Sequence, residues 1–79
     1  MNKYSVIYFK LKGLDKLIYV RGYRIHLSGD VRFANLHFTY DKLKARQIWN
    51  LHLEYVLDAV KLNFKDMLDF VEIEKIKND

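Results

Sequence analysis

The sequence contains no cysteine and no proline, and only three of its 79 residues are glycine. Without cysteine the chain forms neither a disulfide framework nor a thiolate metal site, which fits the reducing cytoplasm where we expect the protein. The longest uncharged stretch, residues 33–40, is far shorter than the roughly 20 residues of a membrane-spanning helix. These absences favour a soluble protein without membrane association.

Hydrophobic residues make up 51% of the chain and aromatic residues 15%, which is too apolar for a disordered segment. A chain of this length cannot divide its apolar residues between two cores, so we expect residues 1–79 to form a single domain. The net charge of +4 is unevenly distributed. Residues 1–40 carry seven Lys or Arg and two Asp, whereas residues 41–79 carry seven Lys or Arg and eight Asp or Glu. The basic half predicts an anionic partner, either nucleic acid or an acidic protein surface, although chance placement of solubilising charge is the alternative.

Two segments near the start, residues 4–12 and 17–27, are rich in β-branched and aromatic residues and flank a loop at residues 13–16. This pattern predicts a β-hairpin. Pairing Lys12 with Leu17 separates apolar from polar side chains, whereas a shift of one strand by one residue mixes them. The apolar face then contains Ile7, Phe9, Leu11, Ile18 and Val20.

A change in the apolar pattern after Gly22 predicts a β-bulge at Gly22-Tyr23, which places Ile25 and Leu27 on the core face. Ser28-Gly29-Asp30 is typical of a three-residue turn into a third strand. That turn pairs Leu27 with Val31 and Ile25 with Phe33 on the inside.

From Tyr40 to about Leu62 the apolar spacing is helical, with Thr39 as N-cap and Asp41 in the first turn. Residues 70–76 alternate apolar and acidic side chains, as a strand with one buried face does. We therefore expect an α+β fold in the order β-β-β-α-β. It consists of a three- to four-stranded, mainly antiparallel sheet with one long helix packed on one face.

The outward face of the first three strands combines cations with flat rings. Single-stranded nucleic acid binds to such platforms, because bases stack on the rings while phosphates meet Lys and Arg. Protein interfaces are also enriched in Tyr and Arg, and a third interpretation is that cross-strand pairs only stabilise the sheet. The predicted partner-binding residues are Tyr8, Lys10, Lys12, Tyr19, Arg21, Tyr23, Arg24 and Arg32, with Tyr4 and His26 on the same face.

The predicted helix has an apolar arc about twice as wide as packing on one sheet requires. One flank would stay exposed in a monomer, and two such flanks would bury each other in a homodimer. The alternative is that residues 33–38 and 63–68 cover it. The predicted oligomer interface consists of Ile48, Leu51, Tyr55 and Leu62.

No motif for catalysis or metal binding is present. His26, His37 and His52 have no metal-binding spacing, and no glycine-rich phosphate loop occurs. Glu54 and Asp58 lie one helical turn apart, but Lys61 beside them is typical of a solvated charged face. We therefore expect no catalytic residue, no metal and no cofactor in a protein that is not an enzyme.

The chain is short, contains only four arginines, and passes from an Ala34–Thr39 strand into a helix before a final Val71-Glu72-Ile73 strand. In this general character it resembles the small accessory proteins of bacteriophages and mobile elements, including anti-CRISPR and other anti-defence inhibitors. The resemblance implies binding to a surface of a host protein or nucleoprotein complex, in the cytoplasm of the host cell. Inhibitors that mimic DNA are usually acidic, so the basic charge argues against DNA mimicry by the whole molecule.

The sequence thus predicts a non-enzymatic interaction protein that acts by stoichiometric binding, as a phage-type inhibitor of a CRISPR-Cas-like defence complex. The alternative is a small DNA- or RNA-binding protein or regulator that uses the same sheet face. Steep loss of affinity with salt would identify phosphate contacts. A structural subunit is a third hypothesis, for which a ring or filament would be diagnostic.

Overall fold

Three long strands begin the chain in the computed structural model, which describes residues 3–28 and 31–76. They are β1 (Tyr4–Leu11), β2 (Ile18–Ser28) and β3 (Val31–Thr39). Next come the short 3₁₀ helix η1 (Lys42–Lys44), the two-residue strand β4 (Ile48–Trp49) and the 3₁₀ turn η2 (Asn50–His52). The α-helix α1 (Leu53–Phe64), the 3₁₀ turn η3 (Lys65–Met67) and the strand β5 (Leu68–Ile76) complete the order.

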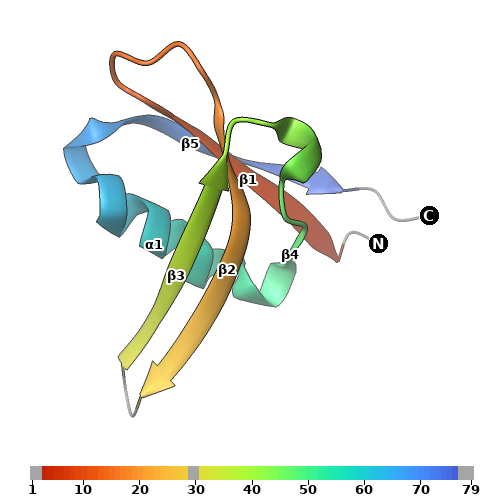
Figure 1. The fold of residues 1–79 in the computed structure, drawn as a ribbon. Helices are drawn as coiled ribbons and strands as arrows, with labels where there is room; N and C mark the ends of the chain where they lie inside the picture. Colours follow the sequence, from red (N-terminus) through yellow and green to blue (C-terminus); the bar gives the residue numbers. More distant parts are fainter. Residues whose placement is uncertain (1–2, 29–30, 77–79) are drawn as a thin grey trace.

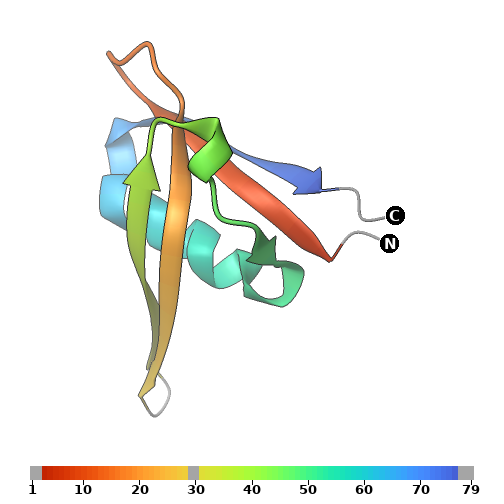
Figure 2. The same ribbon diagram turned by 45° about the vertical axis from the view of Figure 1, so that its right-hand side comes forward.

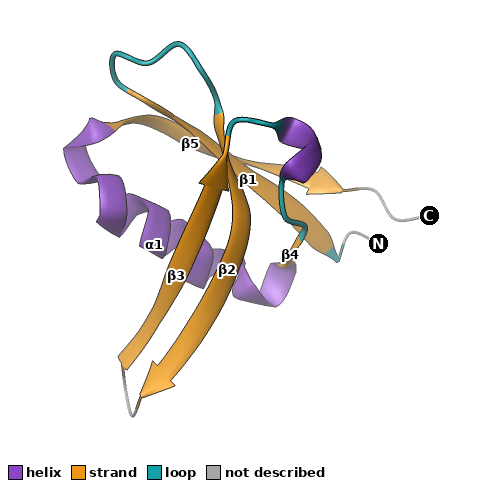
Figure 3. Ribbon diagram, viewed as in Figure 1, coloured by secondary structure: helices purple, strands orange, loops and turns teal. Residues whose placement is uncertain are grey.

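In the described residues the sheet has five strands, and all its pairings are antiparallel. β5 pairs with β1 along its whole length, so β2 and β4 share the opposite edge of β1. The β2–β3 hairpin crosses the β1–β5 pair, and α1 packs on the sheet (Figures 1 and 3). The sheet of the described residues is open and does not close on itself. This arrangement confirms the predicted α+β class, an antiparallel sheet with one long helix that covers residues 50–67 when its 3₁₀ ends are included.

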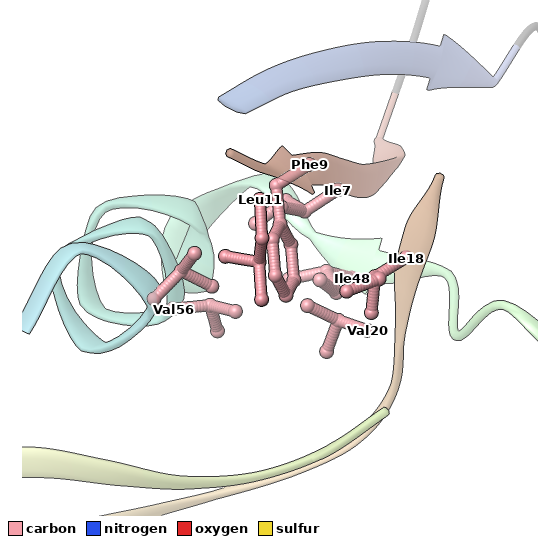
Figure 4. Packing of buried hydrophobic residues seen from close by; sticks show 8 residues of the cluster. Ile7, Phe9, Leu11, Ile18, Val20, Ile48 and Val56 are labelled. Carbon is pink, nitrogen blue, oxygen red and sulfur yellow. The ribbon is translucent and has the colours of Figure 1, made fainter. Parts of the chain in front are cut away.

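The core lies where the two strand pairs cross, and Figure 4 shows side chains from β1, β2, β4 and α1 converging there. Phe9 fills its centre, with its ring centroid 4.9 Å from that of Phe64 and 5.5 Å from that of Phe38. Ala34 on β3 and Ala59 on α1 are both buried, so small side chains let the helix approach β3 closely. Burial of each large apolar side chain contributes about 1.5–3 kcal/mol.

The first hairpin has the predicted faces in a different register. Phe9 pairs with Ile18, so residues 12–17 form the connection, and the predicted pairing of Lys12 with Leu17 is wrong. The Lys12 N–H instead donates to the Met67 carbonyl at 2.8 Å, because the chain leading into β5 occupies that end of β1. A shift by two residues keeps every side chain on its face, which is why the predicted apolar set is buried.

A bulge interrupts β2 as predicted, but its extra residue is Arg21, between Val20 and Gly22. Ile25 then pairs with Ala34, and Leu27 with Arg32, so the predicted register of the second hairpin is wrong by one residue. The predicted turn at residues 28–30 includes residues 29–30, which lie outside the described part of the chain. Leu27 is 70% exposed rather than in the core, because the hairpin extends beyond the helix that covers the sheet (Figure 2).

The predicted helix begins too early. Asp41 accepts a hydrogen bond from the Leu43 N–H at 2.9 Å and starts only the short η1, while Thr39 Oγ1 accepts from the Asp41 N–H. Ile48 then enters β4, where it pairs with Ser5 and is fully buried. Burial of Ile48 beside β1 outweighs the helical spacing of the segment. No helix within the described ranges is long and apolar enough to cross a membrane.

Candidate interaction surfaces

The outward face of β1 is neutralised by acids on β5. Lys10 Nζ forms an ion pair with Asp69 Oδ2 at 3.1 Å, and the Tyr8 hydroxyl donates a hydrogen bond to Glu72 Oε2 at 2.6 Å. Register explains these contacts, because Tyr8 stands opposite Glu72 and Lys10 opposite Phe70, next to Asp69. Two predicted partner-binding residues therefore already have acidic partners within the molecule.

Glu72 also changes the chemistry of the Tyr8 phenol. The hydrogen bond to the Glu72 carboxylate raises the pKa of Tyr8, with further contributions from burial and from the negative charges of Glu72 and Glu74. The Tyr8 ring lies 5.9 Å from the Tyr19 ring, measured between centroids. The two rings thus form a cross-strand pair that a carboxylate holds in place.

The same face is partly covered by the segment between β3 and β4. Lys42 of η1 forms an ion pair with Glu74 Oε2 at 3.6 Å, and η1 lies close to β2. Val6 and Tyr19 point outward, yet only 6% and 8% of their surfaces are exposed. Tyr19 is therefore unavailable as a platform for stacking, whereas Lys12 is exposed beside the loop.

The sequence placed Tyr23 on the outward face, but Tyr23 lies on the opposite face, because the bulge at Arg21 turns it toward η2. Its hydroxyl shares a 2.8 Å hydrogen bond with Nδ1 of His52. The Arg46 guanidinium lies 5.9 Å from the Tyr23 ring centroid, and the Trp49 ring packs edge-on against His52. Tyr23 thus anchors β2 to η2 and leaves the candidate partner-binding set.

An open groove adjoins this cluster, with a cavity volume of about 510 Å³. One wall consists of Tyr23, Ile25 and Leu27, which alternate along one face of β2, and the other consists of His52 and Tyr55. This groove was not predicted from the sequence, in which Leu27 fits a core position and His52 fits the interior of a longer helix.

The outward face of the β2–β3 hairpin keeps its positive charge. Arg21 and Arg24 are exposed, and neither forms an ion pair within the described residues. Neither residues 18–28 nor residues 31–39 include an aspartate or glutamate. The Asn35 side-chain nitrogen lies 3.1 Å from Nε2 of His26 on the same face. We call this set the hairpin face; it consists of Arg21, Arg24, His26, Asn35 and His37.

A shallow depression of about 320 Å³ lies on the hairpin face, lined by Arg21, Gly22, His37 and Phe38. His37 stands opposite Gly22, which has no side chain to fill the space. His37 was not among the predicted site residues, because its position opposite Gly22 depends on a register that the sequence placed one residue off. The side chain of Arg32, another predicted site residue, lies outside the described part of the structure.

The predicted oligomer interface is divided. Ile48 is fully buried in β4, so its assignment to an exposed helix flank is wrong. Leu51 and Leu62 are 68% and 67% exposed, while Tyr55 lines the groove. These three residues retain one apolar side of the helical segment.

The described residues contain no group of three or more side chains suited to hold a metal ion. His52 contacts Tyr23, whereas His26 contacts Asn35 on the opposite face. The Ser5 hydroxyl is buried and donates to Asn50 Oδ1 at 2.9 Å. Comparisons of the chain with protein-family models, with curated proteins and with solved structures give no match.

Proposed function

We propose that this protein is a non-enzymatic binding protein that recognises an acidic partner through the hairpin face. The observation that supports this proposal is the separation of charge after folding. The carboxylates of β5 face β1, where Lys10 and Tyr8 engage them, whereas Arg21 and Arg24 have no acidic neighbour on their strands. Complementary charge steers such partners together and fixes their orientation.

A protein partner has more support than nucleic acid. Binding of single strands depends on exposed rings among the cations, since each base stacks on one. Three of the four tyrosines that the sequence placed on this face are held elsewhere: Tyr8 by Glu72, Tyr19 in a buried position, and Tyr23 against His52. The fourth, Tyr4, is exposed but lies on β1, outside the hairpin face. A small DNA- or RNA-binding regulator is therefore the second candidate, supported by the exposed Arg21 and Arg24 alone.

The target class comes from the sequence resemblance. Within this proposal the protein blocks a host protein or nucleoprotein complex of a bacterial defence system by occupying its surface in a stoichiometric complex. A homodimer through Leu51, Tyr55 and Leu62 belongs to the same proposal, supported by the exposure of the two leucines. Light scattering should then give twice the chain mass, and Leu51→Lys with Leu62→Lys should halve it. A single-chain mass for the unaltered protein would contradict the dimer.

The binding surface is tested by charge reversal. Immobilised protein is incubated with nuclease-treated bacterial lysate, and recovered proteins are quantified for Arg21→Glu/Arg24→Glu and for the control Lys3→Glu/Lys61→Glu. Both double variants change the net charge equally, and Lys3 and Lys61 are exposed outside the hairpin face. Loss of two exposed charge contacts costs about 1–2 kcal/mol, or about tenfold in affinity.

A specific partner should be lost from the hairpin variant and kept by the control. Equal recovery from both variants would contradict the proposal. Binding of a single-stranded oligonucleotide that weakens steeply with salt and depends on Arg21 and Arg24 would favour the second candidate instead.

A further inference from the structure

The strand β2 has one edge without a backbone partner over most of its length. β1 pairs with it only at Ile18 and Tyr19, and the Val20 carbonyl accepts a hydrogen bond from the Arg46 N–H at 2.8 Å. From Arg21 onward, no strand in the described part of the chain pairs with β2 on the side away from β3. Figure 1 shows this part of β2 extending past β4. Unpaired edges of this kind accept further strands.

The groove lies on one face of this edge. Tyr23, Ile25 and Leu27 present a side chain at every second position, which matches the repeat of an extended chain laid beside them. His52 and Tyr55 form the far wall, so the inward side chains of an added strand would be enclosed on two sides. The groove therefore fits apolar side chains at alternate positions.

The opposite face of the same edge is basic. Arg24 and His26 alternate with the groove residues, and no acid of β2 or β3 lies beside Arg24. The other side chains of an added strand would meet the Arg24 guanidinium and the His26 imidazole. Cross-strand neighbours of opposite charge stabilise a pair, and like charges destabilise it. The edge thus fits a strand whose apolar side chains alternate with acidic ones.

The molecule contains one pair of this composition. β1 carries Ile7 and Phe9 on its inner face, and β5 adds Val71 and Ile73 opposite them. On the outer face, Tyr8 donates to Glu72 at 2.6 Å and Lys10 pairs with Asp69 at 3.1 Å. In this pair, β1 has apolar inner side chains and the phenol of Tyr8 and the ammonium of Lys10 outside, and β5 completes it with apolar inner and acidic outer side chains. From Arg21 onward, β2 likewise has apolar side chains on one face and Arg24 on the other, but no described strand pairs with its edge away from β3.

We propose that the free edge of β2 binds an extended segment of the partner protein, in which apolar and acidic side chains alternate, by adding it to the sheet. The segment's backbone pairs with residues 21–28, its apolar side chains enter the groove, and its acids meet Arg24 and His26. This inference rests on the proposed function and specifies the chemistry of the partner segment.

The probe for this site is a synthetic peptide of alternating valine and glutamate, about as long as the nine residues of β5. Its control replaces every glutamate with lysine. Backbone amide signals of the full-length protein are followed by NMR during titration, and amide exchange is measured at saturation. We expect the acidic peptide to bind and to protect alternate amides within residues 21–28, whereas the basic peptide does not bind.

Two variants that replace a cation with glutamate, one at the proposed site and one outside it, test the role of charge. Arg24→Glu should weaken the acidic peptide about tenfold and allow the basic peptide to bind, while Lys61→Glu should change neither. Leu27→Asp should weaken the acidic peptide as well. Because Leu27 is 70% exposed, this variant should keep its fold, which its amide spectrum reports directly.

Three results would overturn the inference: binding without protection of β2 amides, equal binding of both peptides, or protection of these amides by a second copy of the chain or by an oligonucleotide instead. If the peptide fails while recovery of a lysate partner still depends on Arg21 and Arg24, strand addition is wrong and the hairpin face remains. If neither the peptide nor a lysate partner depends on these residues, both proposals fail.

Discussion

At the scale of single residues, the closest polar contact between β1 and β5 joins Tyr8 to Glu72. The phenol donates to a carboxylate that the β1–β5 register places opposite it, so the contact contributes to the neutralisation of the β1 face. A charged acceptor makes such a bond stronger than a neutral one. Its strength also depends on the protonation state of Tyr8, which gives it a measurable signature.

Glu72→Gln should lower the pKa of Tyr8 toward its ordinary value of 10.0, because the main cause of the raised pKa is removed. In the unaltered protein the bond contributes stability below pH 10, and this contribution is lost as pH rises through the raised pKa. Stability should therefore fall more steeply above pH 10 in the unaltered protein than in the variant. NMR titration of the tyrosines and urea unfolding against pH measure both effects. Identical titration of Tyr8 in the two proteins would contradict the contact.

Ile48 provides a second test at this scale. As a fully buried β4 residue, its replacement in Ile48→Ala should cost about 2–4 kcal/mol of unfolding free energy. On an exposed helix flank the same change would cost less than about 0.5 kcal/mol. Leu51→Ala, at a position that is 68% exposed, is the matched control for denaturant unfolding. Similar small losses in both variants would place residue 48 outside the core.

At the scale of secondary-structure elements, the bulge in β2 decides which side chains meet the partner. Before it, Ile18 and Val20 face the core, and after it Tyr23 and Ile25 take that face. Inner residues are even-numbered before the bulge and odd-numbered after it. The extra residue, Arg21, shifts the numbering by one, so both sets lie on the same face of β2. The bulge therefore creates both the Tyr23–His52 contact and the basic alternation that follows it.

Deletion of Arg21 should be tolerated, because Val20 and Gly22 already pair with the consecutive residues Phe38 and His37. Without the extra residue the ladder becomes regular and the side chains that follow keep their faces. Deletion of both Arg21 and Gly22 should instead reverse those faces, so that Tyr23 leaves His52. We expect a loss of about 2 kcal/mol or more for the double deletion and clearly less for the single one. Thermal unfolding followed by circular dichroism measures the difference, and equal stability of the two deletion variants would show that the bulge does not set the alternation.

Elements whose signal is local were predictable. The apolar face of the first hairpin was correct because alternation survives a shift by two residues, and the final strand was correct because Val71 and Ile73 alternate with glutamates. The helix start was not predictable, since Ile48 fits both a helical pattern and a buried strand. The one-residue error in the second hairpin arose because the sequence assigned Ser28 to the turn, whereas Ser28 pairs with Val31 at the end of β2.

The candidate site was predicted less completely than the fold. Arg21 and Arg24 were correctly placed outward, but the loss of Tyr8, Lys10 and Tyr19 from the free surface depends on where β5 and η1 lie. Strand order within a sheet depends on contacts between distant segments, and one sequence carries no direct signal for them. The groove beside Tyr23 could not be predicted either, because its two walls come from β2 and from residues 52–55, which are distant in the sequence.

At the scale of the whole molecule, folding sorts the charges that the sequence spreads along the chain. The acidic β5 lies at one edge of the sheet, beside β1, and the β2–β3 hairpin, whose strands contain no acid, lies beyond the other (Figure 1). Residues 18–39 carry three Arg and one Asp, so half of the net charge of +4 belongs to this projecting hairpin. This asymmetry orients an acidic partner during its approach.

Salt dependence should reflect a small number of charge contacts. For a protein partner recovered from lysate, we expect affinity to fall modestly with salt, and this slope should flatten in Arg21→Glu/Arg24→Glu. Isothermal titration at several salt concentrations measures it. A slope that is unchanged in the variant would locate the electrostatic contacts elsewhere on the molecule.

The most direct measurement of the central claim is partner recovery from nuclease-treated lysate, compared between the hairpin variant and its charge-matched control. If the hairpin face binds the partner, recovery of a specific partner falls about tenfold or more with Arg21→Glu/Arg24→Glu and is retained with Lys3→Glu/Lys61→Glu. Equal recovery of every bound protein from the two variants would contradict binding through the hairpin face.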